Sequence, residues 1–217
     1  MSIFIRPLPF KKDYQGLFQA VAEKFGEFVR DLNDLVGSLS KYISEGKDGK
    51  IKLKTKQLAN AIQALSDKWF GNTDYNKEIL YPLPDPTTGI VTGTTREECE
   101  AVAKQLGLPL KMITRADNGK YYIDVDIGGV GTSGSILDQL RSVIPVFVVI
   151  LDTVEIDAAK WNAIYNAFDT QKQNLNTIMN GFTDKYSNSQ TVFNAAIEIL
   201  NKFLDQFLDL LRNACRA

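Results

Sequence analysis

Histidine is absent from this sequence of 217 residues, and cysteine occurs only twice, at Cys99 and Cys215. Without histidine the chain lacks the most common general base and the most common metal ligand. The two cysteines stand far apart in the sequence, so they do not form the short spacing that is typical of zinc sites. We therefore expect no cofactor, no bound metal and a protein that is not an enzyme.

An excess of basic residues is also missing. Lysine and arginine number 25 against 26 aspartates and glutamates, which gives a formal net charge of -1. Proteins that bind nucleic acid usually carry a basic surplus, so we expect no nucleic-acid partner. One local basic patch consists of alternating lysines, for which a solvated strand face is the simple interpretation and an anionic partner the alternative: Lys47, Lys50, Lys52, Lys54 and Lys56.

Long apolar runs are absent as well. No run reaches the length of about eighteen residues that indicates a membrane-spanning helix. The most apolar window, Val143 to Leu151, contains a proline and is short, and we interpret it as a buried strand. The segment from Met1 to Phe10 contains two prolines and no sustained apolar region, so it does not resemble a cleavable export signal.

The C-terminal part, residues 156–217, has no proline and a single glycine, Gly181. Apolar residues recur there at alternating spacings of four and three, which is the pattern of a coiled-coil seam. We therefore predict one long amphipathic helix, which needs a partner helix to bury its stripe. The clearest part of the stripe is Phe193, Ile197, Leu200, Leu204, Phe207, Leu211 and Ala214.

The same rhythm near the N-terminus supplies the partner, from Phe18 to Tyr42. The fold class is therefore predicted to be α+β, with a long intramolecular antiparallel coiled coil and a mixed α/β domain inserted between its two helices. We divide the chain into an N-terminal arm (1–12), a first coiled-coil helix (13–45), a central domain (46–155) and a second coiled-coil helix (156–217). The second helix is much longer than the first, so part of it lacks a partner within the chain.

Within the central domain the residues predict a short strand at Ile51 to Leu53 and a helix from Thr55 to about Trp69. A loop follows over 81–93. Thr95 and Glu98 form a capping box for a helix that ends at Gly107. A hairpin is expected next, with strands over 111–115 and 121–127 joined by a turn at 117–119.

Two features of the central domain suggest chemistry. Gly129 to Gly134 matches the G-x-G-x-x-G pattern of dinucleotide-binding loops, which keeps an enzyme with a dinucleotide as an alternative function. The strand before it alternates polar and apolar residues, however, unlike the fully buried strand of that fold. Asp124 and Asp126 point to one face of the hairpin, where a solvated face is the simple interpretation and a shared cation the alternative.

The long helix carries a segment with a specific resemblance. Asp184 to Ser189, with the sequence DKYSNS, is followed by Val192 and Phe193 and resembles the KYSNANS segment of type III secretion needle-tip proteins of the IpaD/SipD/BipD family. Asp157 to Phe168 and Gly46 to Leu65 resemble two further segments of that family in the same order. The resemblance runs over about 14–217. It departs from the family in lacking the N-terminal helical hairpin before the first coiled-coil arm and in the more apolar stretch over 141–154.

This resemblance implies a protein that is secreted to the bacterial surface and caps the needle of a type III secretion system. It implies control of secretion and a platform for translocator proteins during host-cell invasion, by a tip complex of about five copies that meets the host membrane only indirectly. Bile salts are a further ligand implied by the family. A generic coiled-coil adapter remains the other alternative.

The needle subunit would dock on the second helix. We expect the docking residues in and after the DKYSNS segment, at the polar positions opposite the apolar seam. They are Lys185, Asn188, Gln190, Asn194, Glu198, Asn201 and Asp205. Glu198 stands where the family can carry lysine, and an ordinary solvated face is the alternative for the whole set.

Overall fold

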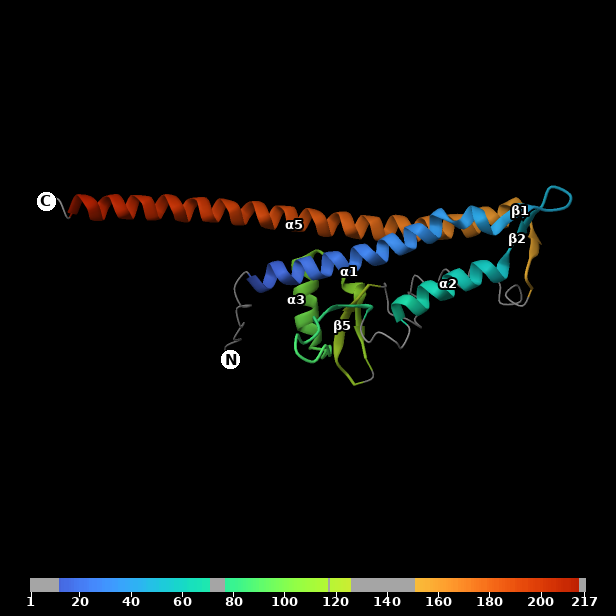
Figure 1. Ribbon diagram of the computed structural model, residues 1–217, viewed down its shortest axis with the longest axis horizontal. Helices are drawn as coiled ribbons and strands as arrows, with labels where there is room; N and C mark the ends of the chain where they lie inside the picture. The colour runs from blue at the N-terminus through green and yellow to red at the C-terminus, as the bar shows by residue number, and fades with distance from the viewer. Residues whose placement is uncertain (1–11, 71–76, 117, 126–150, 215–217) are drawn as a thin grey trace.

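A computed structural model describes residues 12–70, 77–116, 118–125 and 151–214. Two antiparallel helices, α1 (Lys12–Gly37) and α5 (Ala158–Ala214), form its frame. As Figure 1 shows, α5 runs the length of the molecule, whereas α1 lies along only the half that begins at the start of α5. The predicted α+β fold with coiled-coil arms of unequal length is confirmed.

The apolar stripes of the two helices form the core of this coiled coil. From α5, four side chains are buried against α1: Ile164, Phe168, Leu175 and Phe182. One polar contact interrupts the seam, because Asn33 Nδ2 donates a hydrogen bond of 3.5 Å to Asn176 Oδ1. A polar pair inside a coiled coil favours one register over others, since any shift would separate the two amides.

The end of the first arm differs from the prediction. Helix α1 ends at Gly37 and is followed by a 3-10 turn, η1 (Leu39–Tyr42), and by strand β1 (Ile43–Glu45), so the predicted helix over 13–45 is too long at its C-terminal end. The chain leaves the helix because Ile43 to Glu45 pairs antiparallel with β2 (Ile51–Leu53). Pairing with a strand outweighs the helical heptad pattern at this end.

Strand β6 (Val154–Ile156) pairs with the other side of β2 and completes a three-stranded antiparallel sheet of order β1-β2-β6. This strand was not predicted. It leads directly into α5, whose first turn is capped by Asp157, since Lys160 N donates a hydrogen bond of 2.7 Å to Asp157 Oδ1. The sheet therefore closes the end of the coiled coil where α5 begins.

Helix α2 (Thr55–Phe70) packs against α1 and confirms the predicted helix. Trp69 packs edge-on against Phe28 with ring centroids 5.2 Å apart, and its Nε1 donates a hydrogen bond of 2.8 Å to Asp31 Oδ2. Lys68 Nζ lies 2.6 Å from the same carboxylate and 3.1 Å from Glu27 Oε1. The hydrogen bond from Lys68 lowers the pKa of Glu27, so this cluster of charges holds α2 on α1.

The second small sheet has the order β3-β5-β4, from β3 (Ile79–Tyr81), β5 (Tyr121–Asp124) and β4 (Ile113–Arg115). The β4–β5 hairpin is the predicted one, and β3 was not predicted. A 3-10 turn, η2 (Leu110–Met112), precedes β4. Lys24 of α1 holds this sheet to the coiled coil, since its Nζ donates a hydrogen bond of 2.7 Å to the Ile79 carbonyl.

Helix α3 (Arg96–Leu106) has both predicted ends. The Thr95 side chain accepts a hydrogen bond from Glu98 N, and Gly107 ends the helix in the left-handed region at φ 75°. In Figure 1, α3 and the sheet of β5 lie together on one side of α1, where the central domain forms a compact body beside the coiled coil.

Asp124 corrects one expectation about the hairpin. Its side chain is only 8% exposed and accepts a hydrogen bond from Thr114 Oγ1, so the face that carries Asp124 is not solvated. Asp126, the other predicted member of this face, lies outside the described residues, and so do Gly129 to Gly134 and the window over 143–150. No cluster of potential metal ligands occurs in the described part of the chain, and none of its helices is long and apolar enough to span a membrane.

Candidate docking surface

Helix α5 changes character after Tyr186. Before this residue its inner side chains are buried, whereas none of the side chains described after it is buried. Ile199, an isoleucine on this part, is 69% exposed. We call residues 187–214 the free stretch. A helix of this length gains most of its stability from packing an amphipathic face, so an uncovered one is suited to receive a partner.

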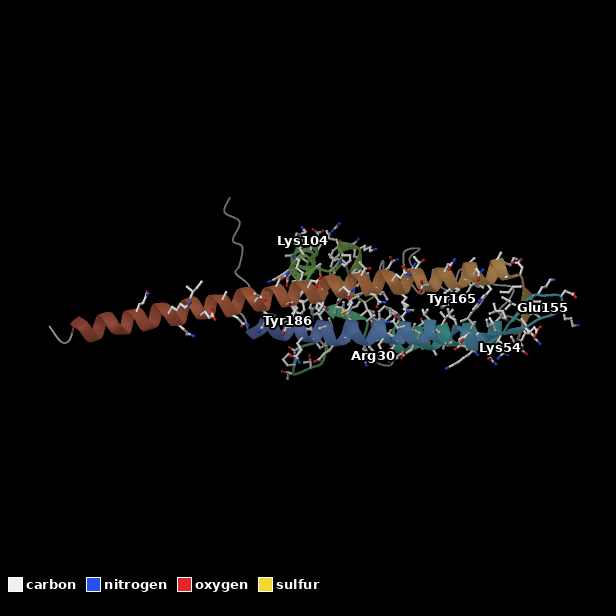
Figure 2. The ribbon with its side chains drawn as sticks, turned by 90° about the horizontal axis from the view of Figure 1, so that it is seen from above. Arg30, Lys54, Lys104, Glu155, Tyr165 and Tyr186 are labelled. Carbon is white, nitrogen blue, oxygen red and sulfur yellow. The ribbon has the colours of Figure 1, made fainter. Side chains whose placement is uncertain are left out.

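Aromatic stacking marks the end of the covered part. Phe18 of α1 stacks on Phe182 with ring centroids 4.1 Å apart and contacts Tyr186 at 4.6 Å. Phe182 is 1% exposed, whereas Tyr186, one turn further along α5, is 39% exposed. Figure 2 shows Tyr186 beside the start of α1, at the point where α5 continues alone.

The C-terminal end of α3 reaches α5 at the same place. A Cβ atom on Gly107 would lie 2.8 Å from Lys185 Cγ and 3.5 Å from the Gly181 carbonyl oxygen. Only glycine fits here, because the residue also adopts a positive φ. The Lys185 stem thus lies against the end of α3, where the helix dipole favours a cation. We call Phe18, Gly107, Gly181, Phe182, Lys185 and Tyr186 the junction.

The seven predicted docking residues divide between these two regions. Lys185 belongs to the junction, and Gln190 is half-buried and already engaged in an interaction within the chain. Four members are exposed on the free stretch: Asn188, Asn194, Glu198 and Asn201. Asp205 lies on α5, but its side chain is outside the described ones.

The helical period corrects the predicted position of the stripe. At about 100° per residue, Asn194, Glu198 and Asn201 follow one another along one face, about a quarter-turn away from the apolar seam rather than opposite it. Ile199 points to a different face. A partner that covers the seam can therefore contact the polar stripe with its flank.

The unequal lengths of the two arms predicted the free stretch, whereas no pattern in the sequence indicated the contacts of the junction. The capping pattern predicted that α3 ends at Gly107, yet a helix stop carries no signal about which distant element it will touch. The heptad seam predicted that Phe18 belongs to the coiled coil, but it did not predict that the covered part of α5 ends beside this residue. The absence of glycine and proline after Gly181 was the useful signal, because it indicated a helix longer than its partner.

Among the groups of the central domain whose pKa is shifted, a thiol and a tyrosine hydroxyl could serve as nucleophiles, but both are structural. Burial raises the pKa of the Cys99 thiol to about 11, which keeps it protonated and unreactive near neutral pH. Burial also raises the pKa of the Tyr81 hydroxyl, which donates a hydrogen bond of 2.6 Å to Glu98 Oε1. Neither group has the lowered pKa that activates a nucleophile.

Comparison with known proteins agrees with this architecture. Over 201 residues the chain is 27% identical to the cell invasion protein SipD of Salmonella typhi, which covers 92% of this chain and 55% of the relative. It is 23% identical to SipD of Salmonella typhimurium over 92% of this chain and 56% of that protein. The chain thus spans about half the length of the curated relatives it matches.

Solved structures share the fold. The structure is similar to that of BipD, a component of the type III secretion system of Burkholderia pseudomallei, with a TM-score of 0.58 and 19% identity over 94% of this chain and 69% of that one. A second BipD structure gives a TM-score of 0.56 at 20% identity, over 88% of this chain and 61% of that one. The family model of type III secretion systems tip complex components matches residues 9–210. The chain therefore belongs to the family of type III secretion tip complex components.

Proposed function

We propose that this chain is a needle-tip protein that caps the needle of a type III secretion system at the bacterial surface. It controls secretion and serves as a platform for translocator proteins during host-cell invasion, without a catalytic role. The match of the family model over residues 9–210 carries this proposal. The dinucleotide alternative is not carried forward, because that match accounts for nearly the whole chain.

The free stretch supports a specific docking mode. Needle capping requires a surface that the tip protein does not use for its own folding, and residues 187–214 provide one at the end of the molecule that carries the C-terminus (Figure 1). A helical partner can lie along this helix and bury its apolar seam. The exposed polar residues Asn194, Glu198 and Asn201 then set the register through hydrogen bonds at the flank.

Two parts of the original residue set receive different roles in this proposal. Lys185 contacts Gly107 at the point where the free stretch begins. It therefore orients the free stretch for docking and does not itself contact the needle subunit. Asn188, Gln190 and Asp205 remain candidate needle contacts together with the three central residues. A ring of about five copies and a bile-salt ligand remain predictions from the family resemblance.

Titration of the isotope-labelled needle subunit with this chain, followed by NMR, tests the docking mode. Replacing both Asn194 and Asn201 by glutamate adds charge to the flank and should weaken binding by about tenfold or more. The matched control is Asn166→Glu, an equally exposed asparagine on the covered half of α5. Unchanged affinity in the double variant would refute the stripe, and no binding by the intact chain would refute the docking role.

A further inference from the structure

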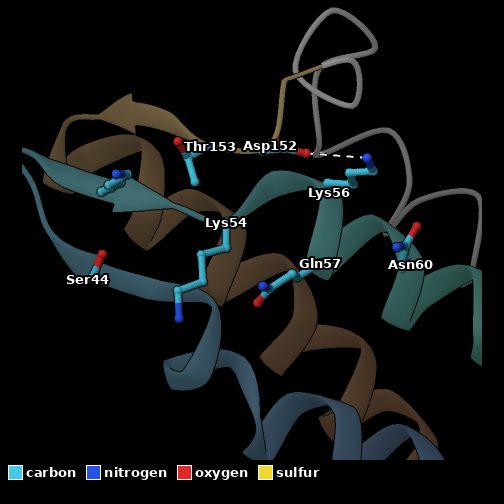
Figure 3. Close-up of a pocket in the computed structure, with 8 residues that line it drawn as sticks. Ser44, Lys54, Lys56, Gln57, Asn60, Asp152 and Thr153 are labelled. Carbon is cyan, nitrogen blue, oxygen red and sulfur yellow. Dashed lines mark ion pairs between the residues drawn. The ribbon is translucent and has the colours of Figure 1, made fainter.

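The structure contains a polar cavity at the end of the molecule opposite the C-terminus. It has a volume of about 420 Å³ and lies where β2 passes into α2, beside the segment that leads into β6 (Figure 3). Its size is within the range of about 300–1,000 Å³ that small-molecule sites occupy. The proposed needle docking does not use this cavity.

Three lysines that are spaced two residues apart in the sequence line the cavity. Lys52 belongs to β2, Lys54 follows the strand, and Lys56 lies in the first turn of α2. Residues two apart in an extended chain point to the same face, so Lys52 and Lys54 lie on one side of this segment, and the first turn of α2 adds Lys56 to the same lining. These lysines belong to the local basic patch for which an anionic partner is the alternative to a solvated strand face.

The three ammonium groups are incompletely satisfied. Lys54 Nζ donates a hydrogen bond of 3.1 Å to the Lys41 carbonyl, which uses one of its three N–H groups. Lys56 Nζ lies 3.4 Å from Asp152 Oδ1, but the two side chains are 62% and 82% exposed, and such pairs are weak. Within the described part of the chain, the Lys52 ammonium has neither an ion pair nor a hydrogen bond.

The walls between the lysines add donors of a second kind. The Thr55 hydroxyl donates a hydrogen bond of 2.5 Å to the Leu151 carbonyl and so fixes the neighbouring segment against this turn. Gln57, Asn60 and Thr153 line the rest of the cavity with amides and a hydroxyl.

We propose that this cavity binds the phosphate group of a phosphorylated polyol, either free or as the headgroup of an anionic lipid. The three lysines that line the cavity supply positive charge for a phosphorylated compound. The amides and hydroxyls suit the hydroxyl groups of the polyol, and the volume exceeds what a bare phosphate needs. The phosphate replaces Asp152 as the partner of Lys56, which is possible because that exposed pair is weak.

Calorimetric titration with inositol trisphosphate and with inorganic phosphate tests the site in the whole chain. Inositol trisphosphate should bind more tightly than phosphate, and Lys52→Gln or Lys54→Gln should each weaken its binding by about tenfold. The matched control is Lys50→Gln, which removes an equally exposed lysine of the same hairpin outside the cavity and should change binding by less than about twofold. Thermal melting of each variant verifies that the fold is intact.

Co-sedimentation with vesicles separates the two sources of the ligand. Binding to phosphatidylcholine vesicles that contain phosphatidylinositol bisphosphate, with loss in Lys52→Gln, would assign the lipid headgroup, and binding of only the soluble compound would assign the free form. If Lys50→Gln and Lys52→Gln weaken binding equally, binding reflects the general surface charge and not the cavity, which would overturn the proposal. It is also overturned if neither inositol trisphosphate nor these vesicles bind, or if phosphate binds as tightly as inositol trisphosphate.

Discussion

The two halves of α5 differ in what covers them, although one unbroken helix contains both. In the first half, Phe168, Leu175 and Phe182 are buried against α1. In the second half, the same kind of apolar spacing continues in the sequence, but α1 has ended and none of the described side chains is buried. The difference shows that a heptad pattern can extend beyond the partner helix that the chain itself supplies, and it supports the proposal that a molecule outside this chain covers the second half.

The junction marks the boundary between the covered half of α5 and the free stretch. Phe18 covers Phe182, the last ring of α5 that is buried among the described side chains, from one side, and the end of α3 contacts Lys185 from another. Because two elements meet the helix within about one turn, the direction of the free stretch is fixed relative to the central domain. A needle subunit would then bind a helix whose orientation is already set, which lowers the entropy lost on docking.

The largest contrast between the halves should appear when one apolar side chain is removed from each. Phe182→Ala removes a ring that is 1% exposed and should reduce the free energy of unfolding by about 3–5 kcal/mol. Ile199→Ala, at a side chain that is 69% exposed, should change it by less than about 0.5 kcal/mol. Urea denaturation measures both values. Similar losses for the two variants would mean that the free stretch is packed against something in the isolated chain.

A smaller effect tests the contact between α3 and α5. Gly107→Ala should cost about 1–2 kcal/mol for its left-handed backbone, and more for the contact with Lys185. Gly49→Ala is the matched control, since Gly49 has a φ of 73° and open space around its position. The added substitution Lys185→Ala should recover the extra loss in the Gly107 variant. If the two glycine variants lose the same stability in thermal melting, the contact between α3 and α5 does not contribute, and only the aromatic contacts of the junction remain.

The long-range frame of this fold could be predicted from the sequence because its signals are local and repeated. The heptads of both arms repeat every seven residues, and the capping box at Thr95 and Glu98 satisfies backbone groups within a few residues. Such local patterns can be recognised without knowledge of the contacts that distant parts of the chain make. The unequal arms followed from the same patterns, and with them the region where the candidate docking surface lies.

The missed parts depend on contacts between distant residues. Strands β3 and β6 have three residues each and form because β5 and β2 offer free edges, which no local pattern announces. The first arm ends early for the same reason, at its pairing with β2. Asp124 looked solvated by alternation, but Thr114 on the neighbouring strand supplies a hydrogen bond that allows its burial. The polar lining of the cavity likewise arises from the turn between β2 and α2.

Amide hydrogen exchange along α5, measured with and without the needle subunit, tests the central claim most directly. In the isolated monomeric chain, exchange should be slow over 160–182 and much faster over 187–214, because an uncovered helix opens locally at low cost. Addition of the needle subunit should slow exchange in the free stretch and leave the covered half unchanged. The account is contradicted if the free stretch is already as protected as the covered half, or if the needle subunit protects only other parts of the chain.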